Sequence, residues 1–512
     1  MLNRRNAIAH LPLGLCWLSA AAHWFAAPAL AQANSITMGY PADVPNWDPV
    51  ANGTPVSLPI HKCVFDAPIS LAPDLSFGPS IVRSHRWVSA DGTALELTLR
   101  DDVTFHNGDP LTSEDLQFTF RDRIRADQSV MAAGVWGGTL VNDIETPSAN
   151  VAVFRFNAPF VHAPQQLAST AAFIVPKRYF QQVGPQGFND RPIGSGPYRL
   201  VDYQRDSRIV LEAYDKYWAG PAKIRQVVIQ IIKDASARAS AIRAGQIDCV
   251  VNLPVREAVQ LNSVPGLVGE VYPINSIVLI QMVNKGIYRD QNLRLAMHHA
   301  IDKQALSRAF FDNRAAPLSM WSGTGMPAND PSFKFAFDPV EATRLLAQSG
   351  YDTANPARIQ MSTFNGVFPN DFDLARAIVQ MWKQVGIECE LSVMEITNYA
   401  ELARADKLGA PVLYSWSNPT GDPAIYSGTI LDPSRRFSVW KSDDIPPRLK
   451  PLFVEVDYDK RMDGYRRFDR WAVEQGYAFP ILQSTATFVH TKNIAFVPFK
   501  NGWTLPYFWS LG

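Results

Sequence analysis

Alternation of apolar and polar residues marks the first half of the chain as rich in β-strands. The stretch 86–105 (RWVSADGTALELTLRDDVTF) has this period of two and predicts a hairpin that turns at Asp91-Gly92. Further strands are predicted over three stretches: 151–156, 198–214 and 223–232. Three leucines on the second strand of the hairpin share one face, so we expect them to be buried: Leu95, Leu97 and Leu99.

Helical periodicity takes over after residue 234. Helices are predicted over 235–245, over 293–311 and over 338–350, the last framed by Asp338-Pro339 and Gly350. The order strand, helix, strand over 357–393 implies a right-handed crossover and a mostly parallel sheet. The closing stretch 479–499 returns to strand. The pattern therefore predicts an α/β protein.

The first 31 residues have the anatomy of an export signal. Arg4 and Arg5 precede an apolar run that ends in the small-x-small sequence at 29–31, so we predict a signal peptide over 1–31, cleaved after Ala31. Two histidines and a proline interrupt the run, which disfavours a retained membrane anchor. The paired arginines leave both the general secretory and the twin-arginine route open. We expect a periplasmic protein without a membrane span in its mature part.

Size and charge narrow the classes of function. A chain of 512 residues has room for two or three domains. The balance of 48 basic and 48 acidic residues produces no field that would attract nucleic acid, so no nucleic-acid partner is expected. Three cysteines remain after removal of the signal, and each lies in an apolar stretch that favours a buried small side chain over a metal ligand: Cys63, Cys249 and Cys389. An oxidising compartment permits one disulfide among them and leaves at least one thiol free.

The stretch 103–116 (VTFHNGDPLTSEDL) gathers one histidine and three carboxylates, as a catalytic or metal site would. Asn107 to Pro110 is ordinary turn chemistry, and Thr112 with Asp115 has the spacing of a capping box. We therefore interpret His106 and its neighbours as scaffold. The chain has no G-x-S-x-G, H-E-x-x-H, G-x-x-x-x-G-K-[ST] or G-x-G-x-x-G sequence. The glycine cluster at 194–197 is too short to bind a phosphate, and its proline lacks an N–H. Since none of these motifs is present, we predict no catalytic residue, no metal and no cofactor.

Six segments, in one order, resemble the family 5 extracellular solute-binding proteins of the dipeptide/oligopeptide-binding type. They are RWVSADGTALELTLRDDVTFHNGDPLTSEDL, the long block GSGPYRL to GQID, NLRLAMHHAIDKQAL, FDPVEATRLLAQSGYD, WSNPTGDP and YAFPILQ. The resemblance implies a two-lobed periplasmic binding protein with mixed sheets, which closes on its ligand about a hinge crossed by two strands. It also implies a monomeric receptor, not an enzyme, that works with an inner-membrane ABC permease and binds a small-molecule ligand.

The resemblance implies where the lobes lie along the chain. Lobe one is expected over 35–272 with a return at 485–512, and an extra strand-rich subdomain at about 80–190 lies within it. Lobe two is expected over 273–484.

The ligand is predicted to be a peptide or a peptide-like molecule. Dipeptide binders of this family commonly carry an aspartate three residues after the tryptophan that matches Trp416, where it pairs with the peptide amine; this chain has Pro419 there. The segment FNGVFPND at 364–371 also lacks the carboxylate-binding arginine that such binders often place there. We therefore expect that free dipeptides are not preferred. Candidate ligand contacts are Trp416, Tyr414, Asn418, Asp422, Asn284, Asn52, Thr54 and Trp503.

Other interpretations stay open. Within the same fold the ligand could be an opine, an oligosaccharide, a chelated metal or another small molecule. A periplasmic sensor or chaperone could use the same two lobes without uptake, because one fold hosts many functions. A different class is a secreted hydrolase whose site is assembled from distant segments. A hydrolase would convert its ligand, whereas a receptor would return it intact.

Overall fold

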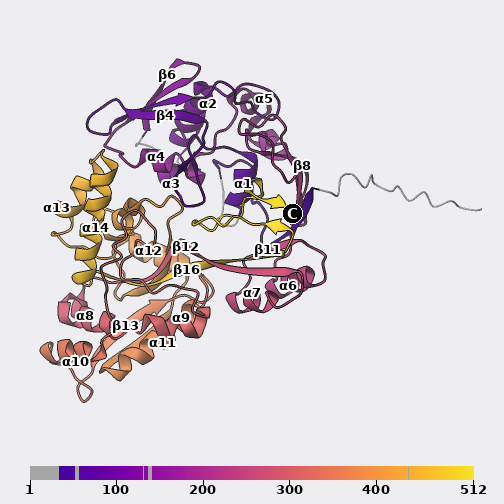
Figure 1. Cartoon of the computed structure of the whole chain (residues 1–512). Helices are drawn as coiled ribbons and strands as arrows, with labels where there is room; N and C mark the ends of the chain where they lie inside the picture. Colours follow the sequence, from indigo (N-terminus) through magenta and orange to yellow (C-terminus); the bar gives the residue numbers. More distant parts are fainter. Residues whose placement is uncertain (1–33, 52–56, 128, 131, 137–140, 436) are drawn as a thin grey trace, which may run out of the picture.

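The structure is a computed structural model that describes residues 34–51, 57–127, 129–130, 132–136, 141–435 and 437–512 (Figure 1). The predicted signal peptide over 1–31 and two of the candidate ligand contacts, Asn52 and Thr54, lie outside the described residues. Within the part of the chain that the structure describes, no helix has the length and apolar character needed to cross a membrane.

The largest sheet of the described structure is mixed and has ten strands (Figure 1). Its strands, in order across the sheet, are β14 (Ile387–Val393), β13 (Ala357–Thr363), β15 (Val412–Ser417), β12 (Leu267–Gln281), β16 (Ala478–Thr491), β11 (Cys249–Val251), β1 (Ser35–Tyr40), β10 (Gln226–Ile231), β9 (Arg208–Ala213) and β8 (Tyr198–Gln204). β13 and β14 pair in parallel and are joined by a helix, α11 (Asp371–Gln384), as the sequence order predicts. The expectation of a mostly parallel sheet is wrong, because β12, β16, β9 and β8 all pair antiparallel with their neighbours.

The two longest strands, β12 and β16, run side by side through the middle of the molecule and pair antiparallel from Leu267–Thr491 to Gln281–Ala478. The register shifts between Pro273 and Ile277, so the ladder is interrupted near its centre. β12 is mostly half-exposed over residues 268–274 and continuously buried from residue 275 onward. A proline without an N–H and a bulge weaken hydrogen bonding at this point, which makes it the natural place for the pair of strands to bend.

The predicted hairpin around Asp91-Gly92 is confirmed. It consists of β4 (Val82–Trp87) and β5 (Ala94–Leu99), which join β7 (Val151–Phe156) and β6 (Val141–Ser148) in an antiparallel sheet in the order β4-β5-β7-β6. Leu95, Leu97 and Leu99 are buried as expected. Two short pairs complete the strands: β2 (Ser70–Leu71) with β3 (Phe77–Gly78), and β17 (Ile494–Ala495) with β18 (Ser510–Leu511).

Fourteen α-helices are described around these sheets (Figure 1). They are α1 (Leu58–Val64), α2 (Ser113–Gln117), α3 (Ala133–Trp136), α4 (Ala163–Gln166), α5 (Lys177–Asp190), α6 (Ala235–Arg243), α7 (Val255–Leu261), α8 (Gln291–His299), α9 (Lys303–Phe311), α10 (Pro339–Gln348), α11 (Asp371–Gln384), α12 (Ile396–Arg404), α13 (Pro446–Leu449) and α14 (Tyr458–Glu474). The single helix predicted over 293–311 is wrong. The chain breaks after α8, and the Asp302 carboxylate caps α9 by accepting the Ala305 N–H at 2.8 Å.

Two large hydrophobic cores divide the molecule. The first gathers buried residues from Ile36 to Val251 and again from Phe488 to Trp509, and the second gathers those from Ile277 to Leu482 apart from Met326, which packs into the first. We call the bodies built on these cores lobe one and lobe two. The four-stranded sheet and the last strands belong to lobe one, and β13, β14, β15 and α14 belong to lobe two. The residue boundaries of the lobes stay a prediction.

The stretch around His106 is scaffold in the structure. Asp115 accepts the Thr112 N–H at 2.8 Å, which closes the predicted capping box. His106 Nε2 lies 3.0 Å from the Gly196 carbonyl, and its Nδ1 accepts the Gly194 N–H at 3.3 Å. Burial lowers the pKa of His106 to about 4, so the ring is neutral and both nitrogens are occupied by the backbone.

The glycine cluster at 194–197 serves packing. A side chain at Gly194 would bring its Cβ within 2.0 Å of the Val64 carbonyl oxygen, so only glycine lets this loop approach the end of α1. Cys63, Cys249 and Cys389 are free thiols, and the first two are buried.

Candidate ligand-binding site

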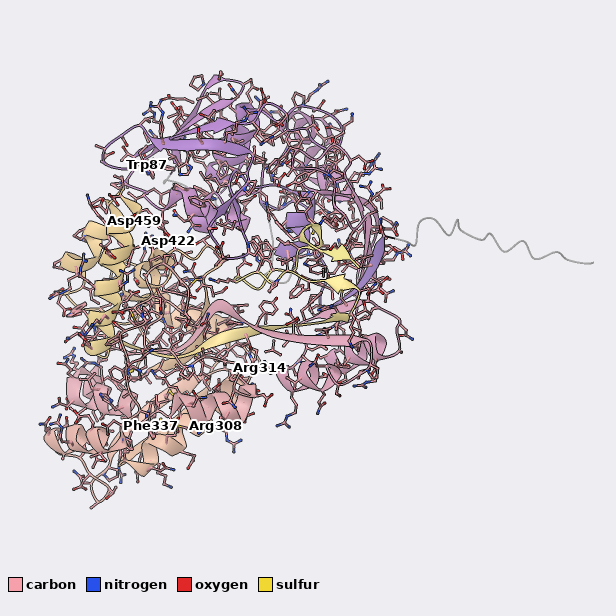
Figure 2. The ribbon with its side chains drawn as sticks, viewed as in Figure 1. Trp87, Arg308, Arg314, Phe337, Asp422 and Asp459 are labelled. Atoms are coloured by element: carbon pink, nitrogen blue, oxygen red, sulfur yellow. The ribbon has the colours of Figure 1, made fainter. Side chains whose placement is uncertain are left out.

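A cavity of about 950 Å³ lies between the two lobes, and its wall comes from both. Lobe one contributes the loop 74–77, the side chains of β4 and the segment 161–165, while lobe two contributes the loops 324–331 and 420–422 and the start of α14. Figure 2 shows Trp87 on the lobe-one side and Asp422 on the lobe-two side of this boundary. The volume lies at the upper end of the range typical of small-molecule sites.

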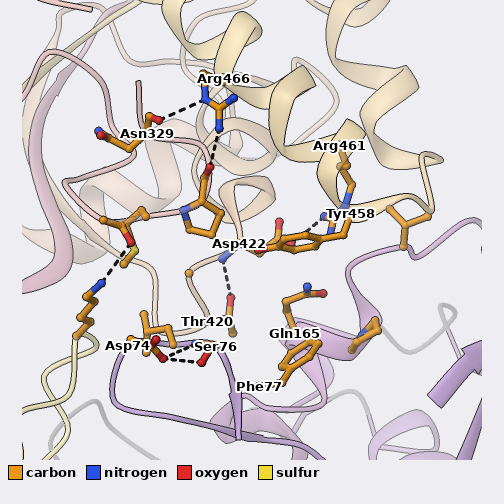
Figure 3. A pocket seen from close by; sticks show the side chains of 18 of the residues that line it. Asp74, Ser76, Phe77, Gln165, Asn329, Thr420, Asp422, Tyr458, Arg461 and Arg466 are labelled. Atoms are coloured by element: carbon orange, nitrogen blue, oxygen red, sulfur yellow. Dashed lines mark hydrogen bonds and ion pairs between the residues drawn. The ribbon is translucent and has the colours of Figure 1, made fainter. Parts of the chain in front are cut away.

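One of the candidate ligand contacts, Asp422, lines this cavity, and its carboxylate is already engaged. Its Oδ2 accepts from Arg461 Nη1 at 2.8 Å (Figure 3), and its Oδ1 accepts the Ala424 N–H at 2.9 Å. Both partners of the ion pair are about 2% exposed. A desolvated pair of this kind is costly to break because one charge would then be buried alone. Asp422 therefore ties the loop 420–422 to α14.

Asn418 is buried beneath the same loop and holds it in shape. Its Nδ2 donates to the Asp422 carbonyl at 2.8 Å, and its Oδ1 accepts the Gly421 N–H at 3.0 Å. Asn275 on β12 donates from its Nδ2 to the Asn418 carbonyl at 2.8 Å. The Asn418 side-chain amide thus forms hydrogen bonds within the loop itself. Its contact with a ligand stays a prediction.

Tyr414 and Trp416 lie on β15, two positions apart, and belong to a row of aromatic rings in lobe two. The Tyr414 ring is stacked on Tyr399 at 5.1 Å, and Trp416 meets Tyr414 edge-on at 5.4 Å. Burial raises the pKa of Tyr414. The Trp416 Nε1 is buried without a hydrogen-bond partner, as is Asn275 Oδ1, although neither residue lines the 950 Å³ cavity. Trp416 leads directly into the loop whose Thr420, Gly421 and Asp422 do.

The structure keeps the two remaining described candidates apart from these. Asn284 lies seven residues beyond Ile277, the partner of Trp416 on β12, which is roughly 23 Å along an extended chain. Its Nδ2 donates to the Lys441 carbonyl at 2.6 Å. Trp503 is buried in the core of lobe one. The candidate contacts therefore do not converge on one cavity.

The charged groups in the cavity wall are engaged by neighbouring groups. Asp74 accepts from the Ser76 N–H and hydroxyl, which lowers the pKa of its carboxyl. Lys500 donates to the Gly325 carbonyl at 3.3 Å, and Arg466 donates to the Pro327 and Asn329 carbonyls at 3.2 and 3.3 Å (Figure 3). No group of three or more His, Cys, Asp or Glu side chains suited to a metal ion occurs among the residues that the structure describes.

Five further residues of the wall are absent from the candidate contacts. Phe77, Trp87, Gln165, Tyr458 and Arg461 line the cavity from segments up to 384 positions apart, 461 − 77. Nothing in the local sequence pattern of any one segment indicates that it faces another. They meet only where lobe one faces α14 across the cavity.

Comparisons with known proteins agree with this architecture. A model of the bacterial extracellular solute-binding proteins, family 5 Middle, matches residues 76–438. The dipeptide-binding protein of Escherichia coli K12 is 25% identical over 444 residues, which cover 78% of this chain and 80% of that protein. Heme-binding protein A of Haemophilus influenzae is 24% identical over 376 residues, which cover 68% and 67%. The structure of HbpA2 from Haemophilus parasuis superposes with a TM-score of 0.84 at 20% identity over 94% of this chain and 100% of that one.

Proposed function

The chain belongs to the family 5 bacterial extracellular solute-binding proteins, and from that membership we propose that it is a periplasmic receptor that delivers a peptide or peptide-like small molecule to an ABC importer. We propose that it acts as a monomer, performs no catalysis and does not prefer free dipeptides. The cavity between the two lobes carries the proposal. Because lobes joined by two strands can close over a solute, contacts on both walls would stabilise the closed arrangement.

Two loops of lobe two support the exclusion of dipeptides. A free dipeptide carries an ammonium and a carboxylate, and each needs an unpaired opposite charge when it is buried. Pro419 takes the place of the amine-binding aspartate, and its carbonyl accepts from Asn501 Nδ2 at 3.4 Å. In the loop before α11, the Asp371 carboxylate accepts the Gly366 and Val367 N–H groups at 2.9 and 2.7 Å, and no arginine stands there. Losing one partner of a desolvated pair costs about 2–5 kcal/mol, or about 30- to several-thousand-fold in affinity.

Mass spectrometry of small molecules that co-purify with the exported protein tests the receptor function. We expect one bound solute, recovered chemically intact after incubation and release. Small-angle scattering should show a more compact particle when that solute is present. Titration calorimetry that gave sub-micromolar binding of ordinary dipeptides would contradict the proposed preference, and conversion of the solute on incubation would favour the hydrolase.

A chelated metal is the second candidate, favoured by relatives whose names include heme-binding and nickel-binding proteins. In this candidate the metal is carried inside an organic chelator, and the protein binds the chelator. Elemental analysis of the purified protein distinguishes this candidate from the first, since a metal-free protein with a bound organic solute would exclude it.

A further inference from the structure

Two exposed aromatic rings stand on opposite walls of the cavity. Phe77 follows the loop 74–76 of lobe one and Tyr458 opens α14 of lobe two, and each is 44% exposed. Figure 3 shows both rings in the wall, with the side chain of Gln165 drawn between them. Large exposed aromatic rings that face one cavity from two lobes mark a place where apolar surface of a partner molecule is expected.

Both rings are supported from behind. The Tyr458 ring is covered by the Arg461 guanidinium at 5.6 Å, and Arg461 is held in turn by Asp422. The Phe77 ring meets the His85 ring edge-on at 5.7 Å and 86°. His85 and Trp87 alternate on β4, so both side chains point to the same face and both line the cavity. Rings that are already held in place lose little conformational freedom when a solute binds.

Gln165 supplies a polar group between the rings. It is 7% exposed, and its Oε1 has no hydrogen-bond partner. A buried acceptor without a donor is costly, and such groups are rare in folded proteins. Gln165 lines the cavity, so a turn of its side-chain amide would bring Oε1 to an N–H group of a molecule there and remove this cost.

We propose that the cavity holds a planar aromatic group between Phe77 and Tyr458, and that Gln165 accepts a hydrogen bond from an N–H donor on that group. An indole or a comparable nitrogen-bearing ring has this chemistry. We propose an uncharged group, because the charges nearest to Tyr458, those of Asp422 and Arg461, pair with each other at 2.8 Å. The inference rests on the proposed receptor function and adds the chemical class of the solute.

Titration calorimetry with two neutral probes tests the site. N-acetyl-L-tryptophanamide and N-acetyl-L-leucinamide share a backbone and differ in the aromatic ring and its N–H. We expect the wild type to bind the tryptophan probe at least about fivefold more tightly. Phe77→Leu and Tyr458→Leu keep an apolar side chain but remove the ring. Each should lower the affinity for the tryptophan probe about 3- to 10-fold and change the affinity for the leucine probe little. Gln165→Met should weaken binding of the tryptophan probe. It should not change the affinity for the analogue whose indole nitrogen is methylated, because that analogue has no ring N–H to donate.

Phe337→Ala is the matched control. Phe337 is 49% exposed on lobe two, far from Trp87 and Asp422 in Figure 2, so its loss should not change either affinity. Equal affinities of the two probes, no detectable binding of the tryptophan probe, or equal losses in Phe337→Ala and Tyr458→Leu would each overturn the proposal. A wild type that carries a co-purified solute but fails these tests would refute the aromatic site alone. A wild type that carries and binds no small molecule would refute the receptor function.

Discussion

Asp469 is a buried carboxylate that should make the stability of this protein fall between acidic and neutral pH. It lies on α14, fully buried, and its Oδ1 accepts the Ser427 hydroxyl while its Oδ2 has no partner. Burial raises its pKa from 3.8 to about 7. Between these two values the folded state binds a proton that the unfolded state has released, so the free energy of unfolding decreases as pH rises.

The magnitude follows from the two pKa values. The two pKa values differ by about 3 units, and each unit corresponds to about 1.36 kcal/mol. The buried carboxylate therefore lowers the free energy of unfolding by about 4 kcal/mol at pH 7 and above, and it has no such effect below pH 4. Asp469→Asn has the same shape and keeps an acceptor for Ser427, but it carries no charge. We therefore expect the variant to be more stable than wild type by about 4 kcal/mol at pH 8, with the difference shrinking by about 1.4 kcal/mol per pH unit below pH 7.

Urea unfolding at pH 4.5, 6, 7 and 8, followed by far-ultraviolet circular dichroism, measures this difference. Asp463→Asn on the exposed face of the same helix is the control and should show little change at any pH, because Asp463 forms a solvent-exposed pair with Arg466. A difference between Asp469→Asn and wild type that does not vary with pH, or a variant less stable than wild type at pH 8, would refute the reasoning.

Three further outcomes are expected. Burial lowers the pKa of Lys303 from 10.5 to about 7, so between these pH values the unfolded protein binds a proton that the folded protein has released. The buried lysine therefore lowers the free energy of unfolding most at pH 7 and below. Lys303→Met should raise that free energy there, and urea unfolding should show the increase shrinking toward pH 10. Arg461→Met should lower stability by about 3–5 kcal/mol because it leaves Asp422 buried alone, and the double variant with Asp422→Asn should recover part of the loss in thermal unfolding. Cys63 and Cys249 are buried and burial raises the pKa of both thiols, so Ellman's reagent should label them only after denaturation, and labelling of the native protein would contradict their packing.

Local patterns predicted the elements whose cause is local. The leucines of the hairpin at 86–105 alternate because one face of β5 is buried, and Asp338 caps α10 by accepting the Glu341 N–H at 2.9 Å. The break between α8 and α9 was missed because apolar residues continue in helical spacing through it, while one cap at Asp302 decides the geometry.

The candidate site was harder to predict because its groups meet only in three dimensions. Asp422 was recognised from its motif, but its partner Arg461 lies 39 residues away on a helix whose sequence carries no signal for the cavity. Asn418 looked like a ligand contact, since a buried amide that shapes a loop and an amide that binds a solute have the same sequence signature. Phe77 and Tyr458 became a pair only once the two lobes were packed together.

Because β12 and β16 run next to each other from one lobe to the other, they also influence the energy needed to rotate one lobe relative to the other. The strands pass the bulge at Pro273 next to each other, so a rotation there twists both by similar amounts and stretches neither. Little elastic energy would then oppose the rotation, and contacts between the lobes, such as Asn501 to Pro419 and Lys500 to Gly325, would favour one orientation. A solute that adds a few contacts of this kind would therefore be sufficient to change which orientation of the lobes prevails.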